Sequence, residues 1–385
     1  MVTSTNRLKI GLVLDTSLDP NDGVQQYVIN IGEWLRSKGH DVHYLVGQTE
    51  NRDLQNVHSL AKNVSVKFNG NSTTIPLPTS KKKLAHFLNQ NKFEILHVQV
   101  PHSPFMAQKL IMAADKKTAV VGTFHILPYG FLSKYGNYAL GIWLKPSLKR
   151  FDKMLAVSLS AAMFARSSFN IDAKVLPNVV DFKNFNSAKP IDKYIDGKVN
   201  ILFLGRLVPR KGCMTLLKAV NILASDDSTS NKIRVIICGT GPLRSKLEKY
   251  VSDHKLNKIV EFKGYVDEVE KPSYYASSQI SVFPSSAGES FGIVLLEAMA
   301  SGKAVVLAGD NPGYRSVMES QESLLFNTND IDNLASKIKF YIDDNNERNK
   351  LAKWGLEYSR KFDIEKVGTQ LLDIYDEALR KRRAL

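Results

Sequence analysis

Apolar runs alternate with amphipathic segments along most of the chain. Short, continuous apolar runs predict strands that are buried on both faces, and the segments between them carry apolar residues at helical spacing. A strand at 8–15 (LKIGLVLD) is followed by a helix over 24–39, and the same unit begins again with a strand at 199–205 (VNILFLG) and a helix over 213–224. Further strands are predicted at 41–47, 93–99, 118–125, 153–158, 232–238, 280–286 and 303–309.

This alternation predicts an α/β fold with two doubly wound domains, each built on a parallel sheet. We place the N-terminal domain at 1–180 and the C-terminal domain at 181–363. They are joined near 177–198, where NSAKPIDKYIDGK has the composition of a linker. The last segment, 364–385, is an amphipathic helix ending in basic residues. Because ligands bind at the carboxyl ends of strands in open α/β sheets, we expect the site in a cleft between the domains.

Composition narrows the class of protein. A length of 385 residues suits two domains, and a hydrophobic fraction of 43% indicates a folded protein. We expect no membrane-spanning helix and no signal peptide, and we expect Cys213 and Cys238 to be buried free thiols in a reducing cytosol. The net charge of +14 indicates an anionic partner. Nucleic acid is disfavoured, because zinc spacing and RNA-binding aromatic patterns are missing from the sequence.

The segment GESFGIVLLEAMASGKAVV (288–306) places one glutamate on each side of a predicted helix start. We expect Ser290 to be the N-cap, which leaves backbone N–H groups free to bind a phosphate. Glu289 is expected to project into the cleft, so that its substitution leaves stability almost unchanged, and Glu297 is expected near the far part of the ligand. The alternative is an ordinary helix with two solvated glutamates. The free N–H groups belong to Phe291, Gly292 and Ile293.

A basic loop, GRLVPRKG, follows the strand at 199–205 and carries Arg206, Arg210 and Lys211. Preorganised cations stabilise a diphosphate leaving group, although a solvated basic loop is the alternative. His125 ends another strand beside the expected cleft, where it is either a ligand contact or a structural histidine. The sequence has no acidic pair in a strand-end loop and no His/Cys cluster, so no metal is predicted.

These motifs resemble glycosyltransferase family 4, whose members have the two-Rossmann GT-B fold. The E-x7-E block carries the resemblance together with DGVQQYVINIGEWLRSKGHDV, GTFH, LPNVVDFKNF, LGRLVPRKG and GTGP, in family order and over nearly the whole chain. Within the family, the chain looks most like the phosphatidylinositol mannosyltransferases.

The resemblance implies a retaining hexosyltransferase that needs neither metal nor cofactor and uses a nucleotide-diphosphate sugar, GDP-mannose-like or UDP-hexose. Departure and attack would occur on the same face of the sugar, and the C-terminal helix would return to the N-terminal domain. The implied catalytic residues are His125, Arg206, Lys211 and Glu289. The implied donor-binding residues are Gly23, Arg206, Lys211, Glu289, Ser290, Phe291, Gly292, Ile293 and Glu297. The implied acceptor-binding residues are Gln25 and Asn69.

The acceptor is less clearly indicated. Val179 replaces the glycine of the family's PNG motif, and NGNSTTIPLP (69–78) has none of the arginines that the mannosyltransferases carry there to bind lipid phosphate. The acceptor therefore stays open between a membrane lipid headgroup, phosphatidylinositol-like or diacylglycerol, and a soluble sugar or glycan. From a different class, a catalytically silent nucleotide-sugar binding module is a further alternative.

A lysine run favours the lipid acceptor. In TSKKKLAHFLNQ, Ser80 can cap a helix whose first turn holds Lys81, Lys82 and Lys83, where cations oppose the helix dipole. Each lysine can contribute about 1 kcal/mol at an anionic membrane. Trp143 and further cations follow in LGIWLKPSLKRF. The sequence thus predicts a cytoplasmic enzyme, peripheral at the inner face of the cell membrane, with a solvated charge run as the alternative.

Overall fold

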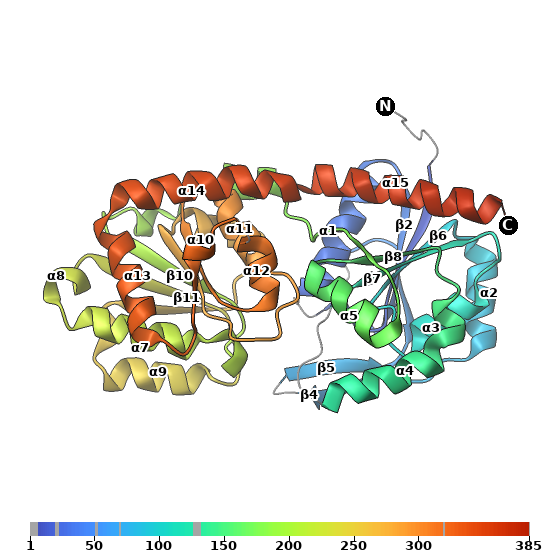
Figure 1. Ribbon diagram of the computed structural model, residues 1–385, viewed down its shortest axis with the longest axis horizontal. Coiled ribbons are helices and arrows are strands. Elements are labelled where there is room, and N and C mark those ends of the chain that lie inside the picture. Colours follow the sequence, from blue (N-terminus) through green and yellow to red (C-terminus); the bar gives the residue numbers. More distant parts are fainter. Residues whose placement is uncertain are drawn as a thin grey trace. The chain divides into compact units, whose positions relative to one another are not determined.

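The structure is a computed structural model that describes residues 7–19, 23–50, 53–68, 71–125, 132–318 and 320–384, without the side chains of 65–68, 71–74 and 132–139. It divides into two compact units (Figure 1). Unit 1 comprises Met1–Val179 with Ile364–Leu385, and unit 2 comprises Val180–Asp363. The last helix therefore belongs to unit 1, as the GT-B resemblance implies.

Unit 1 is built on a parallel sheet with the strand order β3-β2-β1-β6-β7-β8-β9. The chain adds strands first on one side of β1 and then, from β6 onward, on the other side, so that β1 and β6 flank the point where the direction of winding reverses. Both faces of β1 are buried because its residues are almost all apolar. The strands are β1 (Lys9–Leu14), β2 (Asp41–Gly47), β3 (Val57–Ala61), β6 (Ile95–Gln99), β7 (Ala119–Phe124), β8 (Lys153–Ala156) and β9 (Lys174–Val175).

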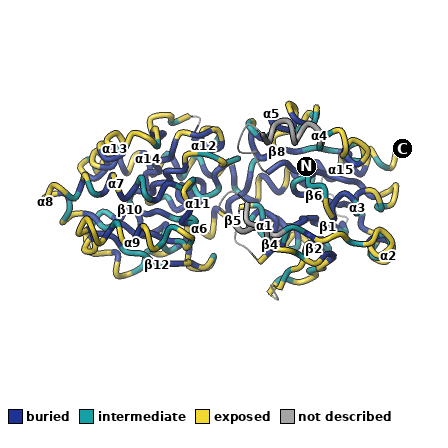
Figure 2. Tube along the Cα trace, turned by 90° about the horizontal axis from the view of Figure 1, so that it is seen from below, coloured by how far each residue is buried: buried dark blue, intermediate teal, exposed yellow. Residues whose placement is uncertain are grey.

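Helices cover both faces of this sheet. Helices α1 (Gly23–Ser37) and α15 (Ile364–Arg383) share one apolar core with β1, and α2 (Lys81–Asn91) and α3 (Met106–Ala113) form the core on the opposite face. Figure 2 shows the buried trace following the strands, with the exposed residues on the outer sides of the helices. The remaining elements are α4 (Leu132–Leu148), α5 (Leu159–Phe169) and an antiparallel hairpin, β4 (Asn63–Phe68) and β5 (Asn71–Pro76), which the sequence did not indicate.

Helix α15 is part of the core of unit 1. Its buried residues pack against α1 and the sheet, and the Tyr375 hydroxyl lies 2.7 Å from Nδ1 of His97 on β6. Near its end, Arg382 Nε donates to the buried Asp152 carboxylate at 2.8 Å. At least one cation at the basic end of the helix therefore forms an ion pair inside unit 1. The buried residues of the helix are Ile364, Val367, Gly368, Leu371, Ile374, Tyr375, Ala378 and Leu379.

We expect Leu371→Ala to lower the free energy of unfolding of unit 1 by about 2–5 kcal/mol, because it opens a cavity in this core. Leu371 is fully buried. Leu159→Ala is the matched control, since Leu159 is exposed on α5 and its truncation leaves no cavity. Urea titration of the two variants measures the difference, and equal stabilities would show that α15 does not contribute to the core as the structure indicates.

Unit 2 repeats the architecture with a parallel sheet in the order β12-β11-β10-β13-β14-β15. Here β10 and β13 flank the reversal. The strands are β10 (Val199–Leu204), β11 (Ile233–Cys238), β12 (Val260–Gly264), β13 (Ile280–Phe283), β14 (Val305–Gly309) and β15 (Leu325–Phe326). The helices are α6 (Phe182–Ser187), α7 (Cys213–Ala224), α8 (Asp227–Ser230), α9 (Arg244–Asp253), α10 (Lys271–Ala276), α11 (Ile293–Ser301), α12 (Pro312–Met318), α13 (Ile331–Asp343) and α14 (Asn345–Ser359).

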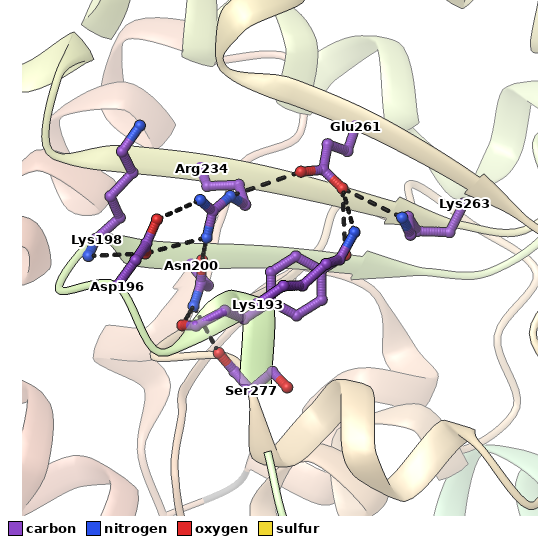
Figure 3. Close-up of polar contacts among 9 residues, drawn as sticks. Lys193, Asp196, Lys198, Asn200, Arg234, Glu261, Lys263 and Ser277 are labelled. Carbon is purple, nitrogen blue, oxygen red and sulfur yellow. Dashed lines mark hydrogen bonds and ion pairs between the residues drawn. The ribbon is translucent and has the colours of Figure 1, made fainter. Parts of the chain in front are cut away.

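The segment with linker composition is packed against unit 2, which corrects our interpretation of it. It forms a 3-10 turn, Asp192–Tyr194, and Tyr194 is buried. The Asn200 amide donates to the carbonyl oxygens of Tyr194 and Ser277, both at 2.9 Å. A charged network continues across the sheet (Figure 3). Its ion pairs join Arg234 to Asp196 and Glu261, and Lys193 and Lys263 to Glu261.

Two expectations from composition can be compared with the structure. Cys213 and Cys238 are both free and buried, and burial raises the pKa of the Cys238 thiol to about 12. This confirms the prediction of buried thiols. Among the residues that the structure describes, no helix is long and apolar enough to cross a membrane.

Candidate active site

In unit 2, two loops meet at the end of the sheet beside β10 and β13, the two strands between which the direction of winding reverses. One follows β10 and contains the turn Pro209–Lys211, and the other follows β13 and runs from Pro284 to Glu289. Because β10 and β13 are neighbours, both loops leave the same edge of the sheet at adjacent positions. This is the position at which open α/β sheets bind their ligands.

Backbone contacts hold the two loops together. The carbonyl oxygen of Arg210 accepts hydrogen bonds from the Ser286 N–H at 3.0 Å and the Ser285 hydroxyl at 3.1 Å. Gly212 has φ +70°, and a Cβ at this position would lie 2.0 Å from the carbonyl oxygen of Pro284. A glycine is therefore required for the basic loop to approach the end of β13 this closely.

The Glu289 carboxylate is the centre of this contact. Its Oε1 accepts from Arg210 Nη1 at 2.8 Å, from Lys211 Nζ at 2.8 Å and from the Ser285 hydroxyl at 2.7 Å. Burial alone would raise the pKa of Glu289, but the charges of Lys211 and Arg210 outweigh burial and hold the pKa below its ordinary value. The side chain is only 12% exposed, which rules out the alternative of a solvated glutamate.

Arg206 lies in the same loop as Lys211 and is half-buried. The loop begins with Gly205, whose N–H donates to the Cys238 carbonyl oxygen at 3.0 Å, and the Arg206 carbonyl oxygen accepts from the Val208 N–H at 2.9 Å. The structure thus brings together Lys211 and Glu289 from the predicted set and places Arg206 in the same loop as Lys211. Arg210, which the sequence analysis weighed only as a basic residue, is a direct partner of Glu289.

The helix start after Glu289 differs from our prediction. Helix α11 begins at Ile293 with Gly292 as its N-cap, so Ser290 is not the capping residue. Gly292 has φ +131°, which is incompatible with a helix starting at Phe291. The ring of Phe291 is instead buried, and its centroid lies 5.8 Å from the ring centroid of Phe362. The residues before Ile293 therefore form an irregular segment.

Glu297 has partners inside unit 2. Its carboxylate accepts from the Tyr275 hydroxyl at 2.9 Å and lies 3.3 Å from Lys271 Nζ, which also pairs with Glu268 at 2.6 Å. Burial alone would lower the pKa of Lys271, but Glu297 and Glu268 together raise it. The alternative of a solvated glutamate is excluded here as well. The sequence analysis did not identify Lys271, because its role depends on a contact between α10 and α11.

In unit 1, His125 follows β7 and is buried. Its Nε2 lies 2.7 Å from Oε1 of Gln99, the last residue of β6, and its ring centroid lies 4.8 Å from that of Tyr27 on α1. Burial lowers the pKa of His125 to about 3, with His97 adding to the effect, so the imidazole is neutral. Gln99 was not predicted; its signal in the sequence was a polar residue at the end of an apolar strand.

The other predicted residues of unit 1 are spread over several elements. Gly23 is the first residue of α1, and the Gln25 amide donates to Thr16 Oγ1 at 3.2 Å and to the Ser17 carbonyl oxygen at 3.3 Å. Asn69 lies outside the described residues. The three lysines are exposed in the first turn of α2, and Ser80 occupies the N-cap position without a side-chain capping bond. Within the described ranges, no group of three or more His, Cys, Asp or Glu side chains could hold a metal ion.

Comparison with known proteins gives the class to which this fold and site belong. Residues 21–184 match the model of Glycosyltransferase Family 4, and residues 185–357 match that of Glycosyl transferases group 1. The chain is 30% identical over 376 residues to a phosphatidyl-myo-inositol mannosyltransferase of Mycolicibacterium smegmatis, covering 96% of this chain and 94% of that protein.

Solved structures agree on the fold. A glycosyltransferase from Rickettsia africae superposes with a TM-score of 0.75 at 20% identity, covering 97% of this chain and 99% of that one. Anabaena HepE in complex with UDP-glucose superposes with a TM-score of 0.66 at 17% identity, covering 96% of this chain and 100% of that one. The architecture is that of a GT-B glycosyltransferase. The chain belongs to glycosyltransferase family 4, and it is a hexosyltransferase.

Proposed function

We propose that the enzyme transfers a hexose from a nucleotide-diphosphate sugar, GDP-mannose-like or UDP-hexose, to a membrane lipid headgroup, phosphatidylinositol-like or diacylglycerol, with retention of configuration. The observation that carries the proposal is the carboxylate of Glu289, held by Arg210 and Lys211 beside the sheet reversal of unit 2. A carboxylate next to two cations is suited to bind a sugar and a diphosphate in adjacent positions.

Each group has a defined chemical task in this proposal. Among the described residues, the contacts of Glu289 converge on Oε1, which leaves Oε2 for the hydroxyls of the sugar. Arg206 and Lys211 stabilise the negative charge that grows on the diphosphate as the glycosidic bond breaks. Retention by departure and attack on one face, and independence of metal, rest on the resemblance to family 4.

The acceptor class rests on two supports. The relative from Mycolicibacterium smegmatis is a phosphatidyl-myo-inositol mannosyltransferase by name, and the match covers nearly the whole of both chains. Lys81, Lys82 and Lys83 are exposed on α2, and Trp143 on α4 is 65% exposed. Helix α3 packs against both α2 and α4. Exposed lysines on α2 and an exposed tryptophan on α4 suit a peripheral contact with an anionic membrane, at the inner face of the cell membrane.

The experiment that tests the function combines a donor screen with product analysis. GDP-mannose, UDP-glucose and other nucleotide sugars are compared by thermal shift, and the stabilising donor is incubated with phosphatidylinositol or diacylglycerol in vesicles. Mass spectrometry identifies the glycolipid and NMR its anomeric configuration. Transfer only to soluble sugars would favour the soluble family 4 alternative, whereas donor binding without transfer or hydrolysis would favour a catalytically silent module.

We expect replacement of Lys81, Lys82 and Lys83 by Gln to weaken binding to anionic liposomes by about 3 kcal/mol, at about 1 kcal/mol for each lysine. The loss should shrink between 0.1 M and 1 M salt, because the Debye length falls from about 10 Å to about 3 Å. Donor affinity should stay unchanged. Flotation with phosphatidylserine vesicles at several salt concentrations measures the effect.

The matched control replaces Lys92, Lys116 and Lys117 by Gln, which removes the same charge. These lysines are exposed and lie before β6 and β7, at the opposite edge of the sheet from the start of α2. Equal losses in the two triple variants would indicate a nonspecific charge effect. Equal binding of the wild type to neutral and anionic vesicles would also contradict the proposed contact between these lysines and an anionic membrane.

A further inference from the structure

Strand β6 ends at Gln99, whose side chain is fully buried and points at His125. The two ends of its amide face different groups. Oε1 lies 2.7 Å from Nε2 of His125, and Nε2 lies 3.4 Å from the backbone carbonyl oxygen of His97. A backbone carbonyl only accepts hydrogen bonds, so the amide NH2 group must face His97. The amide oxygen therefore faces His125.

This orientation determines the tautomer of His125. An amide oxygen only accepts, so Nε2 of His125 must carry the proton and Nδ1 must bear the lone pair. Among the described residues, His97 on β6 and Tyr27 on α1 are the titratable groups that face this ring, and the Tyr375 hydroxyl of α15 lies 2.7 Å from Nδ1 of His97. His97 is neutral as well, because burial lowers its pKa to about 3. The imidazole is thus neutral and held in one tautomer.

The backbone directly after Gln99 is an independent observation. Val100 has φ +57°, a left-handed conformation that is an outlier for a β-branched residue. Its N–H donates to the Thr123 carbonyl oxygen at 3.0 Å, and its own carbonyl oxygen accepts from the Ser103 N–H at 2.9 Å. Such conformations persist where surrounding contacts enforce them, and they concentrate at functional sites. Here the strained residue follows the one that binds His125.

We propose that Gln99 is a positioning residue for His125, which it holds in the Nε2–H tautomer so that Nδ1 accepts a hydrogen bond from a hydroxyl of the transferred hexose. The proposal rests on the proposed function, and it takes His125, which the family 4 resemblance implies as a catalytic residue, to contact the sugar of the donor. It assigns Gln99 no contact with the substrate. A sugar hydroxyl supplies the proton of this bond, and no covalent step is involved.

The test begins with the 15N spectrum of the His125 ring, which needs no substrate. In the wild type we expect the pattern of a neutral imidazole protonated at Nε2. Gln99→Met, which keeps the length of the side chain and removes the acceptor, should give a mixture of the two tautomers. Thr123→Val is the matched control: it removes a 2.7 Å contact to His97 on the neighbouring strand and should leave the His125 spectrum unchanged.

Kinetics provide the second readout. We expect Gln99→Met to lower kcat about 10–100-fold with a small change in KM, by analogy with groups that orient metal-bound histidines. In Gln99→Glu the carboxylate stabilises the imidazolium and raises the pKa of His125. Below that raised pKa, Nδ1 carries a proton and can no longer accept. The activity of Gln99→Glu should therefore fall with decreasing pH through the neutral range, where the wild type stays constant.

A wild-type spectrum with the proton on Nδ1, or a Gln99→Met spectrum identical to the wild type, would overturn the proposal. An unchanged kcat in Gln99→Met, with the tautomer mixture present, would overturn it too, because the contact would then be structural only. Since the spectra need no donor, they decide the contact between Gln99 and His125 even if the proposed transfer reaction is wrong. Full turnover in His125→Ala would reject the sugar contact itself.

Discussion

Glu289→Gln is expected to reduce hexose transfer by at least about 10²–10³-fold, the loss that follows removal of one preorganised polar contact to a transition state. The substitution keeps the shape of the side chain but removes the charge that balances Arg210 and Lys211. Initial rates of product formation, measured with saturating donor and acceptor, give the effect. The loss should fall mainly on kcat, because in the proposed reaction the sugar develops positive charge only as the bond to the diphosphate breaks.

The same variant should also be less stable, which revises the expectation of an almost unchanged stability. Breaking a fully buried ion pair costs about 3–5 kcal/mol, and the cost here should be smaller because Arg210 and Lys211 are partly exposed. Glu248→Gln is the control, since it breaks an exposed Arg–Glu pair at 2.8 Å on α9 of the same unit. Near-normal turnover in a folded Glu289→Gln protein would reject the assignment of Glu289 to the active site.

Arg206→Ala and Lys211→Ala should each lower the rate by about 10²–10³-fold, or about 2.7–4 kcal/mol of transition-state stabilisation. In the proposed reaction, charge on the diphosphate grows as the bond breaks, so the affinity for an unreactive donor analogue should fall less than turnover does. Lys211→Ala should show the larger loss of the two, because Lys211 also pairs with Glu289. Rapid-quench turnover and calorimetric binding of the analogue separate the two quantities.

Lys218→Ala provides the matched control, because Lys218 is exposed on α7, the helix that follows the same loop. If binding and turnover fell by the same factor in Arg206→Ala, the residue would act in ground-state binding alone. Activity should also survive EDTA in both the wild type and the variants. Inhibition that added Mg²⁺ reverses would contradict the proposal that transfer is independent of metal.

Much of the fold could be predicted because it depends on local patterns. A helix was predicted over 213–224, and α7 spans the same residues. The continuous apolar run at 8–15 contains β1, Lys9–Leu14, which is buried on both faces. Strands and helices follow from apolar spacing within one segment, and the alternation of the two defines the doubly wound class.

The site was predicted less completely because its contacts join distant segments. Arg210 and Glu289 are 79 positions apart, and Gln99 and His125 are 26 apart. Periodicity indicates which face of an element is buried, but it does not indicate which polar groups meet once the elements pack. The incorrect N-cap at Ser290 has another cause. A serine before an apolar run is a local capping signal, and the positive φ of Gly292 overrides it.

Helix α15 has a consequence for the order in which the chain folds during synthesis. Domains generally fold as they emerge, with the N-terminal one first. Here the core around β1 includes residues of α15, so unit 1, which is synthesised first, lacks part of its interior until α15 has been synthesised. Unit 2 is continuous from Val180 to Asp363 and has all its strands available earlier. We therefore expect the later unit to fold first on the ribosome. The apolar face of β1 and α1 would meanwhile be exposed to chaperones.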